Sequence, residues 1–207
     1  MATATRLSFA CLASVVVLID TLQAQGSAPA DSPPLDGSMQ IRLTLTTEGF
    51  SHPGSQVLLE AQQQAAMIYD AIGVSLVWTH DPDMDEEGTA PMDFVAVVLS
   101  DARTEQFLKG KEVPPTVLGV APHLTGRVYL FWDRIVRRAW ENDVLPQIVL
   151  ARVLAHEVGH HLMPLQGHSD SGIMRPSVDY RAEDPPAFTQ AQATSIREFL
   201  AEAYPGD

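Results

Sequence analysis

Residues 151–164 read ARVLAHEVGHHLMP, and they are the most informative stretch of this 207-residue chain. Apolar and strongly helix-forming residues around them predict a long helix from Asn142 to Met163 that is apolar on most sides. Pro164 ends this helix, because proline lacks an amide hydrogen and its ring clashes with the preceding turn. A helix that is apolar nearly all round is a buried one, so we expect it inside the fold.

Two histidines and a glutamate in this helix have the spacing of a metal site. His156 and His160 are four residues apart, so their rings project from the same face, one turn from each other. Two imidazole nitrogens can then reach one zinc ion at about 2.0–2.1 Å. Glu157 lies about 100° around the helix from His156, beside the ion, where a general base for metal-bound water is needed.

A catalytic zinc site needs a third protein ligand from beyond the helix. His168 is the preferred candidate, because Pro164 and the glycine before His168 allow the chain to stop the helix and turn back. Asp170 and Glu183 are the alternatives, since carboxylates also complete such sites. The only cysteine of the chain is Cys11, so any metal is expected to be held by histidine, aspartate or glutamate.

The N-terminal residues are predicted to be processed rather than folded. Arg6 precedes a short apolar run, residues 7–19, and Leu22-Gln23-Ala24 offers a cleavage site, so residues 1–24 are typical of a secretory signal peptide. An uncleaved N-terminal anchor is the alternative. Residues 25–38 are predicted to be a flexible linker and residues 39–207 the folded domain. The protein is therefore expected to be secreted or periplasmic.

The composition of the chain limits the classes of molecule that it can be expected to bind. The formal net charge of −13 argues against nucleic acid and anionic lipid, since both require a basic surface. Once the signal is removed, no remaining segment is apolar enough to cross a membrane. We expect a monomer whose partner is a peptide or protein substrate.

The apolar pattern predicts a mixed α/β fold in which helices pack on one sheet. Alternating or continuous apolar stretches predict strands at Gln40–Thr46, Val74–Trp78, Asp93–Leu99, Val117–Pro122 and Arg127–Trp132. Helical spacing predicts helices at Ser55–Ile72, Asn142–Met163 and Thr189–Ala203. Residues 80–91 are expected to form a surface loop, and residues 101–115 a polar connection with one helical turn.

The motif region resembles the metzincin metalloproteases, and among them the matrixins most. The resemblance covers residues 156–176 and rests on His156-Glu157-Val158-Gly159-His160, Gly167-His168-Ser169 and Gly172-Ile173-Met174-Arg175-Pro176. The third histidine comes two residues later than in the usual pattern. The matrixin latency mechanism needs a cysteine, which the mature chain lacks.

The resemblance implies a metzincin-like single domain with a twisted, mostly parallel sheet, a long active-site helix, a Met-turn and a C-terminal helix. It implies one Zn²⁺ held by three ligands, with Glu157 as catalytic base and Met174 as the Met-turn residue. The zinc ligands would be His156, His160 and His168. It further implies a substrate-lining edge strand that contains Val117, Leu118, Gly119, Val120 and Ala121.

These features predict a secreted zinc metalloendopeptidase, which hydrolyses peptide bonds by attack of a zinc-bound water with Glu157 as general base. One alternative is a secreted binding protein with a structural or vestigial zinc site, and another is a zinc hydrolase of a non-peptide amide. Glu157 argues against the first alternative, because a structural site has no use for a base. Met174 favours a protease over the second.

Overall fold

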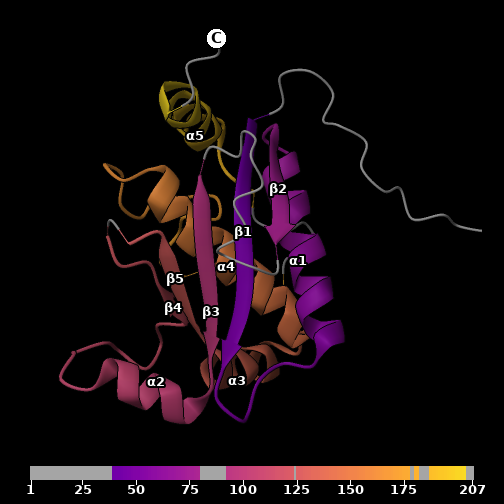
Figure 1. The fold of residues 1–207 in the computed structure, drawn as a ribbon, viewed down its shortest axis with the longest axis vertical. Coiled ribbons are helices and arrows are strands. Elements are labelled where there is room, and N and C mark those ends of the chain that lie inside the picture. The colour runs from indigo at the N-terminus through magenta and orange to yellow at the C-terminus, as the bar shows by residue number, and fades with distance from the viewer. Residues whose placement is uncertain (1–38, 80–91, 124, 178–179, 182–186, 204–207) are drawn as a thin grey trace, which may run out of the picture. The chain divides into compact units, whose positions relative to one another are not determined.

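A five-stranded, mostly parallel sheet runs through the fold in the order β2-β1-β3-β5-β4 (Figure 1). The computed structural model describes residues 39–79, 92–123, 125–177, 180–181 and 187–203, all within one compact unit, Leu35–Asp207. The predicted signal peptide, the linker and the loop at residues 80–91 lie outside the described residues. The strands are β1 (Met39–Glu48), β2 (Val74–Thr79), β3 (Asp93–Leu99), β4 (Gly119–Val120) and β5 (Arg127–Phe131).

Strand pairing confirms the predicted mixed α/β fold with a mostly parallel sheet. β1 pairs in parallel with β2 and β3, and β3 pairs in parallel with β5. β4 alone runs antiparallel to its neighbour, with Gly119 opposite Leu130 and Val120 opposite Tyr129. β4 therefore lies at the edge of the sheet next to β5, which is the position that we expected for this strand.

Helices cover both faces of the sheet. They are α1 (Ser55–Asp70), α2 (Asp101–Leu108), α3 (Trp132–Asn142), α4 (Pro146–Leu162) and α5 (Gln190–Ala203). The main core joins the buried sides of α1, α3, α4 and α5 to one face of the sheet, including Phe94, Ala96 and Val98 of β3. A smaller core on the other face contains Val97 and Leu99 with side chains of α2. β3 is thus covered on both faces, as its continuous apolar run predicted.

The structure corrects the start of the helix predicted at Asn142–Met163: this helix is α4, which begins four residues later, at Pro146, and the preceding helix α3 was not predicted. α3 ends where Asp143 adopts a left-handed conformation (φ 56°, ψ 45°). α4 begins at Pro146, the first-turn position where proline suits a helix because its missing N–H has no helical partner there. α4 is nearly all buried, as predicted, whereas α3 buries only Ile135 and Ala139.

Two further predictions gave the wrong length for an element, one for the edge strand and one for the helix within residues 101–115. The strand predicted at Val117–Pro122 is paired only at Gly119 and Val120, because the backbone N–H of Val117 instead donates to Pro114 O at 3.1 Å in a turn. The connection at residues 101–115 contains the eight-residue helix α2, favoured by Asp101 in its first turn. No helix among the described residues is long and apolar enough to span a membrane.

Candidate metal centre

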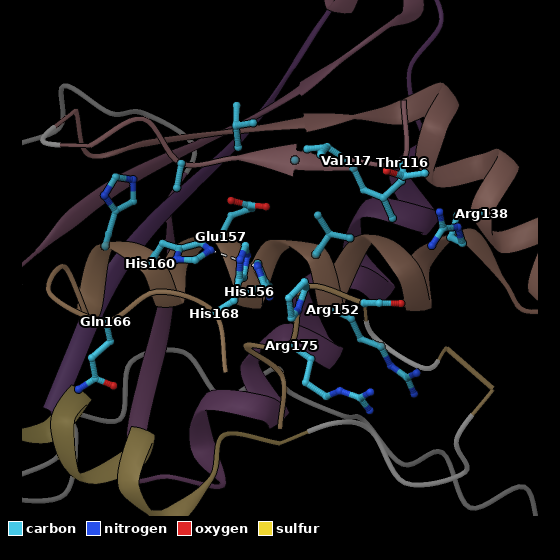
Figure 2. A pocket seen from close by; sticks show the side chains of 18 of the residues that line it. Thr116, Val117, Arg138, Arg152, His156, Glu157, His160, Gln166, His168 and Arg175 are labelled. Carbon is cyan, nitrogen blue, oxygen red and sulfur yellow. Dashed lines mark hydrogen bonds between the residues drawn. The ribbon is translucent and has the colours of Figure 1, made fainter. Parts of the chain in front are cut away.

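Three histidines converge where α4 ends. His156 and His160 project from the last two turns of α4, and His168 comes from the irregular segment that follows it (Figure 2). One ring nitrogen from each lies within 4.8 Å of the others, and the Nε2 atoms of His156 and His160 are 3.1 Å apart. The structure thus brings together the three residues predicted as ligands. Asp170 is outside this group, and Glu183 lies outside the described residues.

The donor set fits a zinc ion. Two nitrogens bound tetrahedrally at about 2.0–2.1 Å lie roughly 3.3–3.4 Å from each other, close to the separation of the His156 and His160 nitrogens. His156 Nδ1 lies 2.8 Å from the carbonyl oxygen of Ile173. Because a carbonyl only accepts, Nδ1 carries the proton and Nε2 presents its lone pair to the site.

The electrostatic environment keeps these imidazoles in the neutral form that binds metals. Burial lowers the pKa of His156 below its usual value. Burial, followed by the neighbouring His156 and His168, lowers the pKa of His160 to about 4. Since only neutral imidazole offers a lone pair, the two histidines on α4 are ready to bind metal at neutral pH.

Glu157 lies beside the histidines and under the edge strand. Only 7% of its surface is exposed, and burial raises the pKa of its carboxyl to about 8. A cation held by the histidines would oppose this shift, because a nearby positive charge favours the carboxylate. A Cβ added to Gly119 would lie 3.0 Å from Glu157 Cγ and 3.1 Å from Glu157 Oε1. A side chain at residue 119 would therefore require the Glu157 side chain to shift by a few tenths of an ångström.

If Glu157 acts as the general base that the sequence predicts, Gly119→Ala is expected to lower hydrolytic activity about tenfold while leaving zinc content unchanged. The new methyl group would push the Glu157 carboxylate by a few tenths of an ångström, and small displacements of a catalytic group are costly. The measurement is kcat/KM on a peptide, together with zinc per chain by elemental analysis. Gly54→Ala is the matched control, because nothing lies within 4 Å of a Cβ at that position. Equal activity of the two variants would contradict the positioning role of Gly119.

Met174 is fully buried and packs against α4. A Cβ on Gly159 would lie 2.7 Å from Met174 Sδ, so the sulfur contacts the helix at the residue before His160. The backbone N–H of Ser169 donates to Met174 O at 3.0 Å, which ties the turn to the residue after His168. Met174 therefore packs against the helix that carries His156 and His160, and its role as the Met-turn residue stays a prediction.

Gln192 on α5 is a supporting residue that the sequence reasoning missed. It is 5% exposed, and its Nε2 donates to Ser169 Oγ at 2.8 Å while its Oε1 accepts from the Thr189 N–H at 2.8 Å. These bonds anchor the segment next to His168 to the C-terminal helix. A glutamine in an ordinary amphipathic helix carries no signal of this role.

Gln192→Ala is expected to weaken zinc binding by about tenfold, because residues that orient a metal ligand typically contribute 10–100-fold to affinity. Competition with a chromogenic chelator measures the zinc affinity of the variant. Gln190→Ala, at an exposed position on the same helix, is the control and should bind zinc as the unaltered protein does. Unchanged affinity in Gln192→Ala would show that the His168 segment holds its position without this contact.

A cavity of about 750 Å³ joins the three histidines and Glu157 to the edge-strand segment. All five residues expected to line the substrate site, Val117, Leu118, Gly119, Val120 and Ala121, line this cavity. Arg138, Arg152, Arg175 and Tyr180 line it too, although the sequence reasoning gave them no firm role. Only the tertiary structure brings these residues together, because α3, α4 and the segment after Met174 are separate along the chain.

No protein-family model and no curated protein matches this chain. Among solved structures, it is similar to the crystal structure of archaemetzincin from Methanopyrus kandleri, with 16% identity and a TM-score of 0.47 over 81% of this chain and 99% of that chain. It is also similar to the solution structure of a Thermotoga maritima protein, with 13% identity and a TM-score of 0.39 over 79% of this chain and 89% of that chain. At these scores neither likeness carries an argument about function, and neither supports the predicted matrixin-like subtype.

Proposed function

We propose that this chain is a secreted zinc metalloendopeptidase whose single zinc ion is held by His156, His160 and His168. One observation carries the proposal: three histidine nitrogens converge beside a buried glutamate inside a cavity that an edge strand borders. A structural zinc site is normally closed by four protein ligands. Here three histidines face an open cavity, which leaves room for water and substrate.

Glu157 is the proton carrier of the proposed reaction. When bound, zinc acidifies a water molecule and polarises the carbonyl oxygen of the peptide bond. Glu157 accepts a proton from the attacking water as the new C–O bond forms at the carbonyl carbon. It then passes this proton to the peptide nitrogen as the C–N bond breaks, so the products are a carboxylic acid and an amine, between which a proton moves to give carboxylate and ammonium.

The edge strand is the proposed binding platform for the substrate backbone. β4 pairs with β5 on one side, and its residues line the cavity next to Glu157. An extended peptide can add to such an edge through main-chain hydrogen bonds, which provide affinity without depending on side-chain identity. This mode requires an unfolded or flexible stretch of substrate. Such a binding mode suits an endopeptidase. In this proposal the signal peptide, residues 1–24, directs the protein out of the cytoplasm, and the protein acts as a monomer.

The test is digestion of an unstructured protein such as casein by the purified, zinc-loaded protein. We expect new peptide fragments, their loss when a chelator removes the metal, and their return when zinc is added back. Mass spectrometry of the fragments identifies the bonds that are cut. A protein that binds zinc stoichiometrically and cuts no peptide would contradict the proposal and favour a structural site. Cleavage of amides only outside peptides would favour the other hydrolase class.

A further inference from the structure

One end of the cavity is lined by three arginines from different parts of the chain. Arg138 comes from α3, Arg152 from α4, and Arg175 follows Met174. In Figure 2 the three lie to one side of Glu157, whereas Gln166 lies on the other side. The cavity therefore has a cationic end and a neutral end on either side of the histidine cluster.

The charge of this end is opposite to that of the chain. The sequence has 26 acidic and 13 basic residues, yet among the described residues that line the cavity three are arginines and Glu157 is the one carboxylic acid. A zinc ion bound by the histidines would add further positive charge. Charge of one sign gathered in a cleft attracts ligands of the opposite sign, and this effect is strong where the walls exclude water.

Two of the arginines, Arg138 and Arg152, also lie near the same hydroxyl of the cavity wall. Arg152 is 5% exposed and lies four residues before His156, so it shares the face of α4 that carries the ligand. Burial raises the pKa of the Tyr180 hydroxyl to about 12, while the positive charges of Arg138 and Arg152 act in the opposite direction. Both guanidinium groups are thus close enough to act on a single hydroxyl in the cavity wall.

Internal contacts of these arginines do not remove their capacity to bind a ligand. Arg138 Nε lies 3.3 Å from Glu141 Oε2, a carboxylate whose side chain is half exposed, and Arg152 also has an interaction within the protein. A guanidinium has five N–H donors in a planar fork, so one contact can coexist with a second. Carboxylates match this fork, often through two parallel hydrogen bonds.

We propose that Arg138, Arg152 and Arg175 form a subsite, the arginine subsite, that binds a substrate carboxylate close to the bond that is cut. This inference rests on the proposed peptidase function and narrows its substrates to peptides with such a carboxylate. The carboxylate comes from an aspartate or glutamate side chain, or from the C-terminus of a short peptide. Main-chain pairing with β4 would hold the backbone, and the arginine subsite would select the side chain.

A binding experiment tests the subsite independently of turnover. The zinc-loaded Glu157→Ala variant is titrated with fluorescent, end-capped, alanine-rich octapeptides that carry one glutamate, moved through every position. Each is matched by a peptide with glutamine in its place and by one with glutamine and a free C-terminal carboxylate. Fluorescence anisotropy measures Kd. At one position we expect the carboxylate to tighten binding by about tenfold or more, as charge-assisted hydrogen bonds do.

Substitution of the two arginines that are not buried, the half-buried Arg138 and the exposed Arg175, assigns the effect to the arginine subsite. In the same Glu157→Ala background, Arg138→Gln combined with Arg175→Gln should remove most of the preference for the carboxylate and leave binding of the glutamine peptide nearly unchanged. Arg137→Gln is the matched control, since Arg137 is the exposed neighbour on α3 that does not line the cavity. It should keep the full preference.

Several outcomes would overturn the subsite. One is an equal Kd for the glutamate and glutamine peptides at every position. Another is a double substitution that weakens the binding of both peptides equally. A preference that survives the double substitution in full would show that Arg138 and Arg175 do not bind the carboxylate. The proposed function fails by a different measurement: the unaltered zinc-loaded protein would leave casein and the carboxylate peptides uncut, whatever the anisotropy result.

Discussion

Glu157→Ala is expected to lower the proposed peptide hydrolysis sharply while the protein keeps its zinc. We expect kcat/KM to fall by about 10²–10⁴-fold, the range that a positioned general acid–base group contributes. Zinc is retained because the three converging nitrogens belong to His156, His160 and His168, and Glu157 is not a member of this group. The paired measurement is peptide hydrolysis by a fluorogenic assay and zinc per chain by elemental analysis.

Glu105→Ala is the control for this variant, because Glu105 is an exposed carboxylate on α2 that does not line the cavity. It should retain both activity and zinc. Glu157→Gln separates shape from proton transfer, since glutamine fills the same space but cannot accept the proton. We expect it to be as inactive as the alanine variant. Full activity in Glu157→Ala would mean that another group carries the proton, and the mechanism would be wrong.

His168→Ala is expected to lose most of its bound zinc and, with it, all measurable hydrolysis. The remaining His156 and His160 supply two ligands, and a catalytic zinc site typically has three. Loss of a direct ligand should reduce zinc affinity by more than about a hundredfold, the upper range for residues that only orient a ligand. Competition with a chelator of known affinity measures the change.

His161→Ala is the control for the loss of zinc, because His161 is adjacent to a ligand but engaged elsewhere. Its ring stacks on Phe94 with centroids 5.3 Å apart, and its Nε2 lies 3.0 Å from the carbonyl oxygen of Arg127. The variant should keep its zinc. If His168→Ala also keeps full zinc affinity, the third ligand is Asp170 or Glu183, and the same substitution at each of these residues identifies it.

Features that depend on local periodicity could be predicted from the sequence. The spacing of His156 and His160 and the place of Glu157 beside them follow from 3.6 residues per turn once the segment is helical. The alternation in β1 and the continuous apolar run of β3 likewise predicted strands that the structure contains. In each case the feature depends only on the residue pattern and the backbone geometry of a single helix or strand.

Element boundaries were harder to predict where local signals compete. The apolar stretch around α4 suggested a helix from Asn142, although Asp143 and Pro146 mark the end of one helix and the start of the next. Proline within the first turn is compatible with a helix, so its presence alone did not reveal the break. The short edge strand was overestimated because an isolated apolar run does not show how many residues find a pairing partner.

By itself, the sequence determined the chemistry on one helix: two histidines, a glutamate and the buried character of the segment that carries them. Only the tertiary structure showed which residues outside this helix join the site. It brought His168 to the two histidines of α4, set Gly119 over Glu157, anchored the ligand segment through Gln192 and gathered the arginines at one end of the cavity. The physical reason is that spacing within a helix follows from backbone geometry. Contacts between distant segments depend instead on how the sheet and helices pack, which no local pattern encodes.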